Sequence, residues 1–292
     1  MNELFVLRQD CSRKEYPMPH PLRHKSTVDP VTCALWLLCA LLLGAMPSLS
    51  AQTVPASENP VPDLQSILAG MAKHNQARGE SLHTYSVDRI YKVENKRINK
   101  SAEVTATMIF VAPGEKLFEI HSASGTGFMR KGVINRIIET EQKNALPDQQ
   151  PKSAISPDNY LFEWVGTEVL QGRRKYVLYA KPRRKDLVLF DAKIWVDAED
   201  FAVTRIEGRP AKNPSFWTRK VDFTHEYEKV GSYWMPVRNY STTQVFIFGR
   251  TTTEIVYSNY QINQPGLAER AEEIRKRDDK LEIQLDPKDK KQ

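Results

Sequence analysis

Cysteine is nearly absent from this chain, and its three thiols, Cys11, Cys33 and Cys39, all lie before residue 40. Removal of the front of the chain would leave a protein without any thiol. That would exclude disulfides, cysteine-ligated metal sites and cysteine nucleophiles. A chain without thiols suits an oxidising compartment, where a free thiol is a liability.

The sequence motifs of common enzyme classes are also missing. Four histidines lie beyond the first 70 residues: His74, His83, His121 and His225. They form no HExxH pattern and no pair with metal-ligand spacing, and neither a GxSxG motif nor a phosphate-cradling glycine loop occurs. The acidic pair Glu199–Asp200 lies in a turn setting, which explains it better than general acid–base chemistry does. We therefore predict no catalytic residue, no metal site and no cofactor, and a protein that is not an enzyme.

Long hydrophobic runs are missing too, with one exception. Residues 31–46 read VTCALWLLCALLLGAM, sixteen residues without a charge. A membrane span needs about 20 apolar residues, whereas a signal-peptide core needs about 7–15. Small residues follow the run, so we expect cleavage after Ser50 or Ala51, with Met18 as an alternative start and an uncleaved inner-membrane anchor as the alternative fate. In either case the chain is predicted to be exported, to the periplasm.

The rest of the chain divides into three parts, after a signal peptide or membrane segment at residues 1–51. A proline-bearing linker covers residues 52–62, one domain covers 63–263, and a charged tail covers 264–292. Asp63 is expected to cap a helix that runs from Leu64 to about Arg78 and ends at Gly79. In the tail, cations and anions balance, which predicts a short helix followed by a disordered end.

Alternation of apolar and polar residues dominates the domain. It predicts strands at residues 85–93, 104–110, 116–121, 161–170, 176–181, 186–190, 193–196, 201–207, 221–229, 234–240, 241–248 and 251–262, and a second helix at 132–144. Strands at such short intervals indicate a sandwich, a barrel or one long curved sheet. Because βαβ alternation is missing, a doubly wound nucleotide-binding fold is unsupported.

Several predicted strands, such as DLVLF at 186–190 and VFIF at 245–248, are apolar on both faces. Two helices can cover only part of so wide a sheet, which leaves room for an apolar groove. Alternation on central strands selects these lipid-binding positions, with the opposite face as the alternative: Met108, Phe110, Leu178, Val196, Val203, Phe223 and Val245.

Basic residues bracket the predicted strand YVLYA at residues 176–180. Arg173, Arg174, Arg183 and Arg184 are interpreted as a rim for anionic headgroups, or alternatively as solvated strand ends. The net charge of +6 suits contact with anionic lipids and is equally explained by solubility. Nucleic acid is disfavoured as a partner, since an exported protein seldom meets it.

One long stretch carries a family resemblance. It reads IWVDAEDFAVTRIEGRPAKNPSFWTRKVDFTHEYEKVGSYWMPVRNYSTTQVFIFGRTTTEIVYSNYQI, and GTGFMRKGVINRII and NYLFEWVGTEVLQGRRKYVLYAKPRRKD belong with it. It resembles exported bacterial proteins of the outer-membrane lipoprotein-sorting, or LolA-like, family, in an acidobacterial-type subgroup. The resemblance covers about residues 62–262.

The resemblance implies a mainly β (α+β) fold of the LolA/LolB type, in which a single curved antiparallel sheet forms an unclosed β-barrel with covering helices. It also implies a periplasmic carrier that shelters the acyl chains of a lipid or lipoprotein in an apolar groove, in outer-membrane lipoprotein sorting. Membrane-bound donor and acceptor proteins would be further partners, and a monomer is expected. The alternative is an envelope-stress sensor or regulatory binding domain of the same fold, anchored at the inner membrane.

Overall fold

The computed structural model describes residues 62–215 and 218–284. The predicted signal segment, nearly all of the linker and the last eight residues of the tail lie outside the described residues. The chain begins with helix α1 (Leu64–Ser81), whose first turn is capped by the Asp63 side chain, 2.7 Å from the Ser66 amide. Ile67 and Met71 are its buried residues, four apart on one face of the helix.

Ten strands follow, with a helical segment between the third and the fourth. The strands are β1 (Thr84–Asn95), β2 (Lys100–Val111), β3 (Glu115–Gly125), β4 (Tyr160–Leu170), β5 (Arg173–Pro182), β6 (Phe190–Asp197), β7 (Val203–Pro210), β8 (Thr218–Val230), β9 (Tyr233–Val245) and β10 (Gly249–Ile262). The helical segment comprises α2 (Gly127–Met129), the π-helical turn η1 (Arg130–Ile134), α3 (Asn135–Ala145) and α4 (Gln150–Ser153), and α5 (Leu267–Gln284) ends the described chain.

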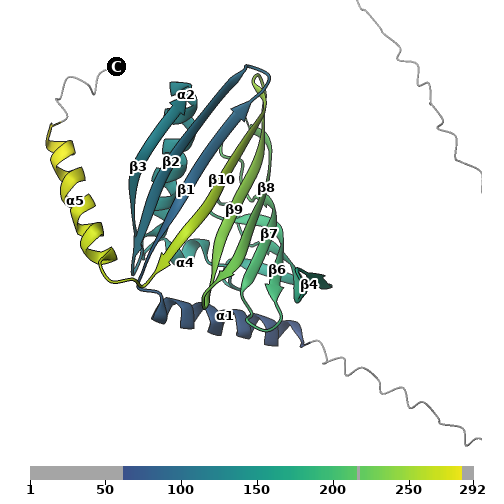
Figure 1. The fold of residues 1–292 in the computed structure, drawn as a ribbon. Coiled ribbons are helices and arrows are strands. Elements are labelled where there is room, and N and C mark those ends of the chain that lie inside the picture. The colour runs from purple at the N-terminus through teal and green to yellow at the C-terminus, as the bar shows by residue number, and fades with distance from the viewer. Residues whose placement is uncertain (1–61, 216–217, 285–292) are drawn as a thin grey trace, which may run out of the picture. The chain divides into compact units, whose positions relative to one another are not determined.

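The ten strands form one antiparallel sheet in the order β3-β2-β1-β10-β9-β8-β7-β6-β5-β4 (Figure 1). Within the described residues, the edge strands β3 and β4 each pair with a single neighbour, so the sheet is not closed. The fold is therefore the unclosed, curved antiparallel sheet with covering helices that the sequence predicted. The chain passes from one edge of the sheet to the other through α2, η1, α3 and α4.

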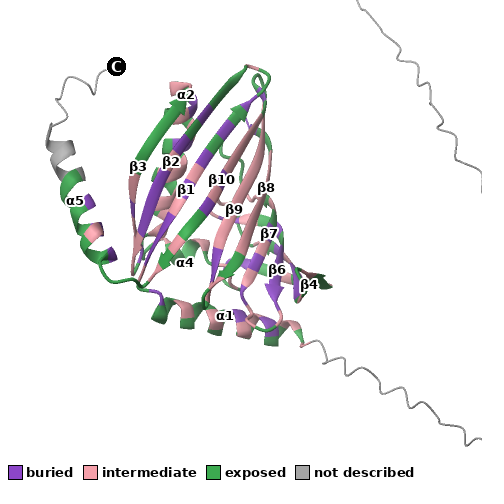
Figure 2. Ribbon diagram, in the orientation of Figure 1, coloured by how far each residue is buried: buried purple, intermediate pink, exposed green. Residues whose placement is uncertain are grey.

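Side chains alternate between two faces of the sheet, because successive residues of a strand point in opposite directions. We call the face that carries Val87 and Tyr91 of β1 the inner face, since the helices α2, η1 and α3 pack there. From Val87 onward, buried residues of β1 alternate with intermediate or exposed ones (Figure 2). The outer face of the same strand carries Lys92 and Glu94, which are exposed.

Two hydrophobic clusters cover the inner face. The first joins β1, β2, β9 and β10 to Met129 and Ile134 of the helical segment. The second joins β5, β6, β7 and β8 to Ile67 and Met71 of α1, which crosses one end of the sheet (Figure 1). A smaller cluster on the outer face packs α5 against Ile109 of β2.

Four local predictions differ from the structure. Gly79 does not end α1, which continues to Ser81 with Leu82 as its C-cap. Residues 186–189 form a turn instead of a strand, because Asp186 accepts a hydrogen bond from the Val188 amide at 3.3 Å. The two strands predicted at 234–240 and 241–248 are one strand, β9, since no turn residue separates Tyr240 from Ser241. The short helix predicted in the tail is α5, which extends to Gln284.

Candidate functional site: the inner face and its helical cover

All seven positions predicted to bind lipid lie on the inner face. Cross-strand pairing places Val87 opposite Met108 and Tyr176 opposite Val196, which fixes the shared face. Met108, Leu178 and Val196 are fully buried in the two clusters. Phe110, Val203, Phe223 and Val245 are half-buried. The accessible part of the predicted surface therefore lies at the last four positions, and the first three are packed core.

A buried ion cluster connects the inner face to the helices above it. We call α2, η1 and α3 (Gly127–Ala145) the helical cover. Arg89 of β1 is 2% exposed, and its Nη1 lies 2.7 Å from Oε2 of Glu141 on α3. Lys116 of β3 places its Nζ 2.7 Å from the other carboxylate oxygen of Glu141. One carboxylate of the cover is thus bound by two cations of the sheet.

Aromatic rings surround the arginine of this cluster. The guanidinium of Arg89 lies 5.4 Å from the ring centre of Phe118 and 4.8 Å from that of Tyr257. Its Nη1 also donates to the Tyr91 hydroxyl at 3.1 Å, while its Nε has no partner among the described residues. A charge enclosed by rings and bonded to one carboxylate depends strongly on that carboxylate.

The protonation of Glu141 follows from these neighbours. Burial by itself would raise the pKa of the carboxyl group. Attraction to Arg89 and Lys116 outweighs that effect and lowers the pKa of Glu141 to about 2. The carboxylate is therefore charged at neutral pH, and it attaches the cover to the sheet by charge-assisted hydrogen bonds.

A strip of the inner face remains accessible. We call it the inner strip, and its members are Phe223, His225 and Tyr227 of β8, Asn239, Ser241, Thr243 and Val245 of β9, and Thr251 and Thr253 of β10, all half-buried. Desolvation lowers the pKa of His225 to about 4 and raises the pKa of Tyr227 to about 12. The side chains of the inner strip therefore keep part of their surface accessible, unlike those of Met108, Leu178 and Val196.

The inner strip carries an unused hydrogen-bond acceptor. Asn239 donates through Nδ2 to the Tyr257 hydroxyl at 2.7 Å, while its buried Oδ1 has no partner among the described residues. His225 pairs with Asn239 across β8 and β9. A buried polar atom without a partner is costly. A ligand with a donor group would satisfy it.

The four arginines predicted as a headgroup rim do not share one rim. Arg173 and Arg174 stand at the start of β5, whereas Arg183 and Arg184 follow its end at Pro182. Since a ten-residue strand is about 30 Å long, the two pairs lie at opposite ends of it. The rim as predicted is therefore divided between two places.

The first of these arginines belongs to a structural ion cluster. Arg173 binds both carboxylate oxygens of Asp197 at 2.7 Å, and the buried Lys175 binds Asp197 at 2.7 Å as well. Burial would raise the pKa of Asp197, but these hydrogen bonds hold it well below its usual range. The cluster fixes the turn between β6 and β7, where the Asp197 carboxylate also accepts from the amide of Asp200 at 2.9 Å.

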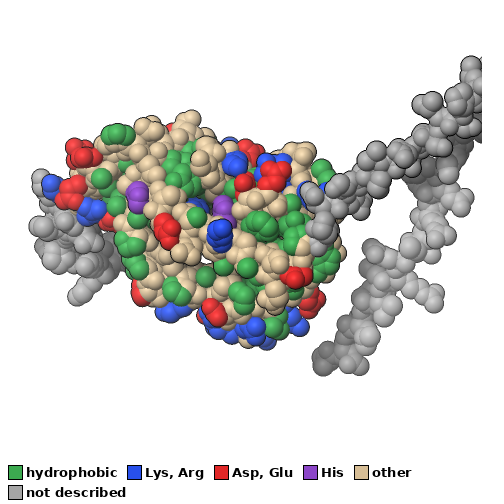
Figure 3. All heavy atoms as spheres, turned by 90° about the horizontal axis from the view of Figure 1, so that it is seen from below, with side chains coloured by type: hydrophobic (Ala, Val, Ile, Leu, Met, Phe, Trp, Pro, Cys, Tyr) green, Lys and Arg blue, Asp and Glu red, His purple; other side chains and the backbone are tan. Residues whose placement is uncertain are grey.

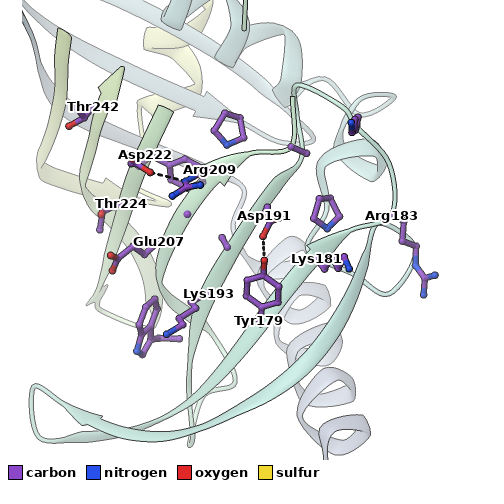
Figure 4. A pocket seen from close by; sticks show the side chains of 18 of the residues that line it. Tyr179, Lys181, Arg183, Asp191, Lys193, Glu207, Arg209, Asp222, Thr224 and Thr242 are labelled. Carbon is purple, nitrogen blue, oxygen red and sulfur yellow. Dashed lines mark hydrogen bonds and ion pairs between the residues drawn. The ribbon is translucent and has the colours of Figure 1, made fainter. Parts of the chain in front are cut away.

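The second pair lines a groove on the outer face of the sheet. The groove has a volume of about 990 Å³ and is lined by Arg183, Arg184 and side chains of β5 to β9. Figure 4 shows its labelled residues, including the Tyr179–Asp191 hydrogen bond and the 2.9 Å contact between Arg209 and Asp222. Burying an acyl chain there would desolvate these charged groups, so the groove suits a polar ligand better.

The end of the molecule at which α1 lies has no single apolar patch. Seen from below, hydrophobic side chains form several areas divided by charged and neutral ones (Figure 3). No helix among the described residues has both the length and the apolar character needed to cross a membrane.

Sequence reasoning missed the ion cluster and the polar part of the inner strip. Arg89 was visible as a charged residue on the apolar face of an alternating strand, which is the signal that a buried partner exists. Its partner Glu141 lies 52 residues away on a different element, and no local pattern connects the two. His225 gave no signal beyond its place in a strand.

No protein-family model and no curated protein matches the chain. Solved structures with similarity to it include a DUF1329 family protein from Desulfovibrio piger, with 12% identity and a TM-score of 0.38 over 70% of this chain and 95% of that one. A putative outer membrane lipoprotein-sorting protein domain from Vibrio parahaemolyticus has 11% identity and a TM-score of 0.36, and the match covers 69% of this chain and 96% of that one. A LolA superfamily protein from Nitrosomonas europaea has 11% identity and a TM-score of 0.34, and the match covers 70% of this chain and 95% of that one. The LolA-like group named from the sequence is thus among these matches.

Proposed function

We propose that this chain is a periplasmic binding protein that shelters the acyl chains of a lipid or a lipoprotein against the inner face of its sheet. The observation that carries the proposal is the ion cluster of Arg89, Lys116 and Glu141, which joins the helical cover to an apolar face. When that contact opens, the cover can move and expose apolar side chains to a ligand. The protein would take part in outer-membrane lipoprotein sorting, with membrane-bound donor and acceptor proteins as further partners.

The energetics favour an acyl chain as the ligand. Each CH₂ group removed from water contributes about 0.8 kcal/mol, without any bond being made or broken. Ile134 and the half-buried Ile137 and Ile138 of the cover pack against the first cluster. An acyl chain that takes their place against the sheet would bury comparable apolar area. The main remaining cost of the exchange is then the separation of Glu141 from Arg89 and Lys116.

The inner strip suits the polar part of the same ligand. Its members include Phe223 and Val245 beside Ser241, Thr243 and Asn239. Apolar and hydroxyl-bearing side chains in one strip match an amphiphile, with a hydrocarbon chain and an ester or amide group. The unpaired Oδ1 of Asn239 would accept a hydrogen bond from an amide or hydroxyl group.

Two neighbouring residues of β9 provide the test. Ser241 points to the inner face and pairs with Phe223, whereas Thr242 points to the outer face and lines the groove there. Ser241→Trp should fill the inner strip and weaken binding of a dansyl-labelled fatty acid about tenfold, a loss of about 1.4 kcal/mol. Thr242→Trp is the matched control and should leave the affinity unchanged. The measurement is fluorescence titration of the full chain, with mass spectrometry of lipids that co-purify from a bacterial host.

Three outcomes would count against the proposal. If the purified protein carries no lipid and does not bind the labelled fatty acid, acyl chains are excluded as its ligand. Weakening by Thr242→Trp alone would move the site to the outer groove. A tightly bound protein in place of lipid would favour the regulatory alternative.

A further inference from the structure

The hairpin between β9 and β10 ends in three consecutive exposed apolar residues. Phe246, Ile247 and Phe248 are 56%, 59% and 45% exposed. They follow Val245 and precede Gly249, which pair with each other at the last position of the β9–β10 register. We call these three residues the apolar tip. Their exposure is not required by the sheet, because the strand pairing is complete before the tip begins.

The tip is held in place by its neighbours. Asn95 at the end of β1 donates to the Phe248 carbonyl at 3.0 Å. The guanidinium of Arg219 on β8 lies 4.4 Å from the ring centre of Phe246. The β1–β2 and β9–β10 hairpins lie together at the top of Figure 1. The apolar tip is thus part of a defined end of the molecule.

Eight cations lie in the segments at this end of the molecule, and Glu94 and Glu103 are the acids nearest in sequence to the segment from Asn95 to Lys100. The basic collar consists of Lys96, Arg97, Lys100, Arg130, Lys131, Arg219, Lys220 and Arg250. The sequence segments 95–100, 126–132, 211–220 and 246–250 contain no aspartate or glutamate. Among the described residues, only Lys220 of these eight forms an ion pair, with Asp222. The start of α2 belongs to this end as well, since Thr126 donates to the Ser101 carbonyl at 2.8 Å.

We propose that this end of the molecule docks on an anionic lipid bilayer, with the apolar tip inserted between headgroups and the basic collar at the phosphate level. A few inserted apolar side chains give only weak membrane binding, and neighbouring basic residues supply the second attraction that makes it stable. The tip and the collar provide both. A protein partner would need a matching apolar socket inside an acidic ring, whereas an anionic bilayer offers both properties at every point of its surface.

Docking in this orientation has a consequence for ligand entry. Val245, the last inner-strip residue of β9, is the residue next to the tip. The inner strip therefore leads to the docked end. A lipid could pass between bilayer and protein there, although docking itself does not rest on the proposed acyl-chain site.

Photocrosslinking of the full chain tests the proposal at single residues. p-Benzoylphenylalanine is placed at Ile247, and the protein is irradiated with vesicles of phosphatidylcholine and phosphatidylglycerol. A lipid adduct on the peptide containing residue 247 is expected. Its yield should fall at least about tenfold in pure phosphatidylcholine vesicles, or when Lys96, Arg97 and Lys100 are all changed to Glu, because each cation adds a similar share of the attraction.

The matched control places the same photoreactive group at Val169. This residue is 71% exposed and lies beside the β4–β5 turn, at the opposite end of the strands. Both proteins contain the same residues 1–61, so a difference between them cannot come from that segment. The proposal would be overturned if no lipid adduct formed at residue 247, or if the adduct yields at residues 247 and 169 were equal. It would also be overturned if the yield at residue 247 did not depend on the charge of the lipid.

Discussion

Glu141 makes the attachment of the helical cover sensitive to acid. Its pKa is about 2 in the folded protein, against 4.5 ordinarily, because attraction to Arg89 and Lys116 outweighs burial. A carboxyl group whose pKa is lowered by folding stabilises the protein above its ordinary pKa. This contribution is lost as the pH falls from about 4.5 towards 2, and it amounts to something on the order of 3 kcal/mol.

Glu141→Gln should therefore lower the free energy of unfolding at pH 7 by about 3 kcal/mol, since it leaves Arg89 buried without its anion. The difference in the free energy of unfolding between the variant and the parent protein should become smaller as the pH falls to 3. Urea unfolding at pH 7, 4 and 3 measures both quantities. Glu119→Gln is the control, because its partners Arg270 and Arg277 are exposed, and a loss below about 1 kcal/mol is expected. A difference that is independent of pH would contradict the assignment.

For single residues, the sequence predicted which of them share a face of a strand better than it predicted whether they are packed or accessible. Alternation placed Met108, Leu178 and Phe223 on one face of their own strands, with the opposite face left open for each. Only the strand register shows that they share the inner face. Alternation could not separate packed core from accessible surface, since that depends on how far the cover reaches. The contact between Arg89 and Glu141 depends on tertiary structure and has no local signal.

At the scale of secondary structure, strands were predictable from the sequence where one face of the strand is more polar than the other. The strand predicted at 85–93 is most of β1, whereas the strand predicted at 104–110 misses the first four residues of β2, Lys100 to Glu103. Residues 186–189 are apolar like a strand, yet they form a turn, because hydrogen bonding by the Asp186 side chain competes with sheet pairing. The apolar stripe of Leu267, Ala271 and Ile274 predicted a short helix. The charged residues that follow were interpreted as a disordered end, so the length of α5 was underestimated.

That stripe makes α5 a specific part of the domain. Ala271 is fully buried, and it clusters with Ile109 and Leu117 on the outer face of the sheet. Ala271→Glu should place a charge in this contact and detach α5, lowering the free energy of unfolding by about 1–3 kcal/mol. Hydrogen exchange should rise in α5 and in the β2–β3 peptides beneath it.

The control for this change lies three residues earlier in the same helix. Ala268 is exposed, so Ala268→Glu adds the same charge and side chain without entering the contact. Exchange in the variant with Glu at position 268 should match that of the parent protein. Equal exchange in both variants would mean that α5 is not held by this face.

For the molecule as a whole, the weakest connection in the sheet lies between β7 and β8. Four residue pairs join these strands, from Arg205 with Glu226 to Gly208 with Phe223. The second cluster extends across this junction to Phe223 and Tyr227 of β8, and the first includes Val230 at the end of β8 and continues on β9. Among the described strands, no other neighbouring two are joined by so few residue pairs. A curved sheet that opens to admit a ligand would bend where the pairing is shortest. The junction between β7 and β8 is that place.

Gly208, beside the junction between β7 and β8, lets β7 lie close against β6 because it has no side chain. A Cβ there would lie 2.3 Å from the Asp191 carbonyl oxygen and 2.4 Å from the Ala192 Cβ, so Gly208→Ala must push β6 and β7 apart. Overpacking of this kind costs about 1–3 kcal/mol, and hydrogen exchange should rise first in β6 and β7. Gly79→Ala is the control, because nothing lies within 4 Å of its Cβ position in α1, and a gain of about 0.5–1 kcal/mol is expected. Urea unfolding compares the two, and a Gly208→Ala protein as stable as its parent would show that the strands can separate at this point without loss.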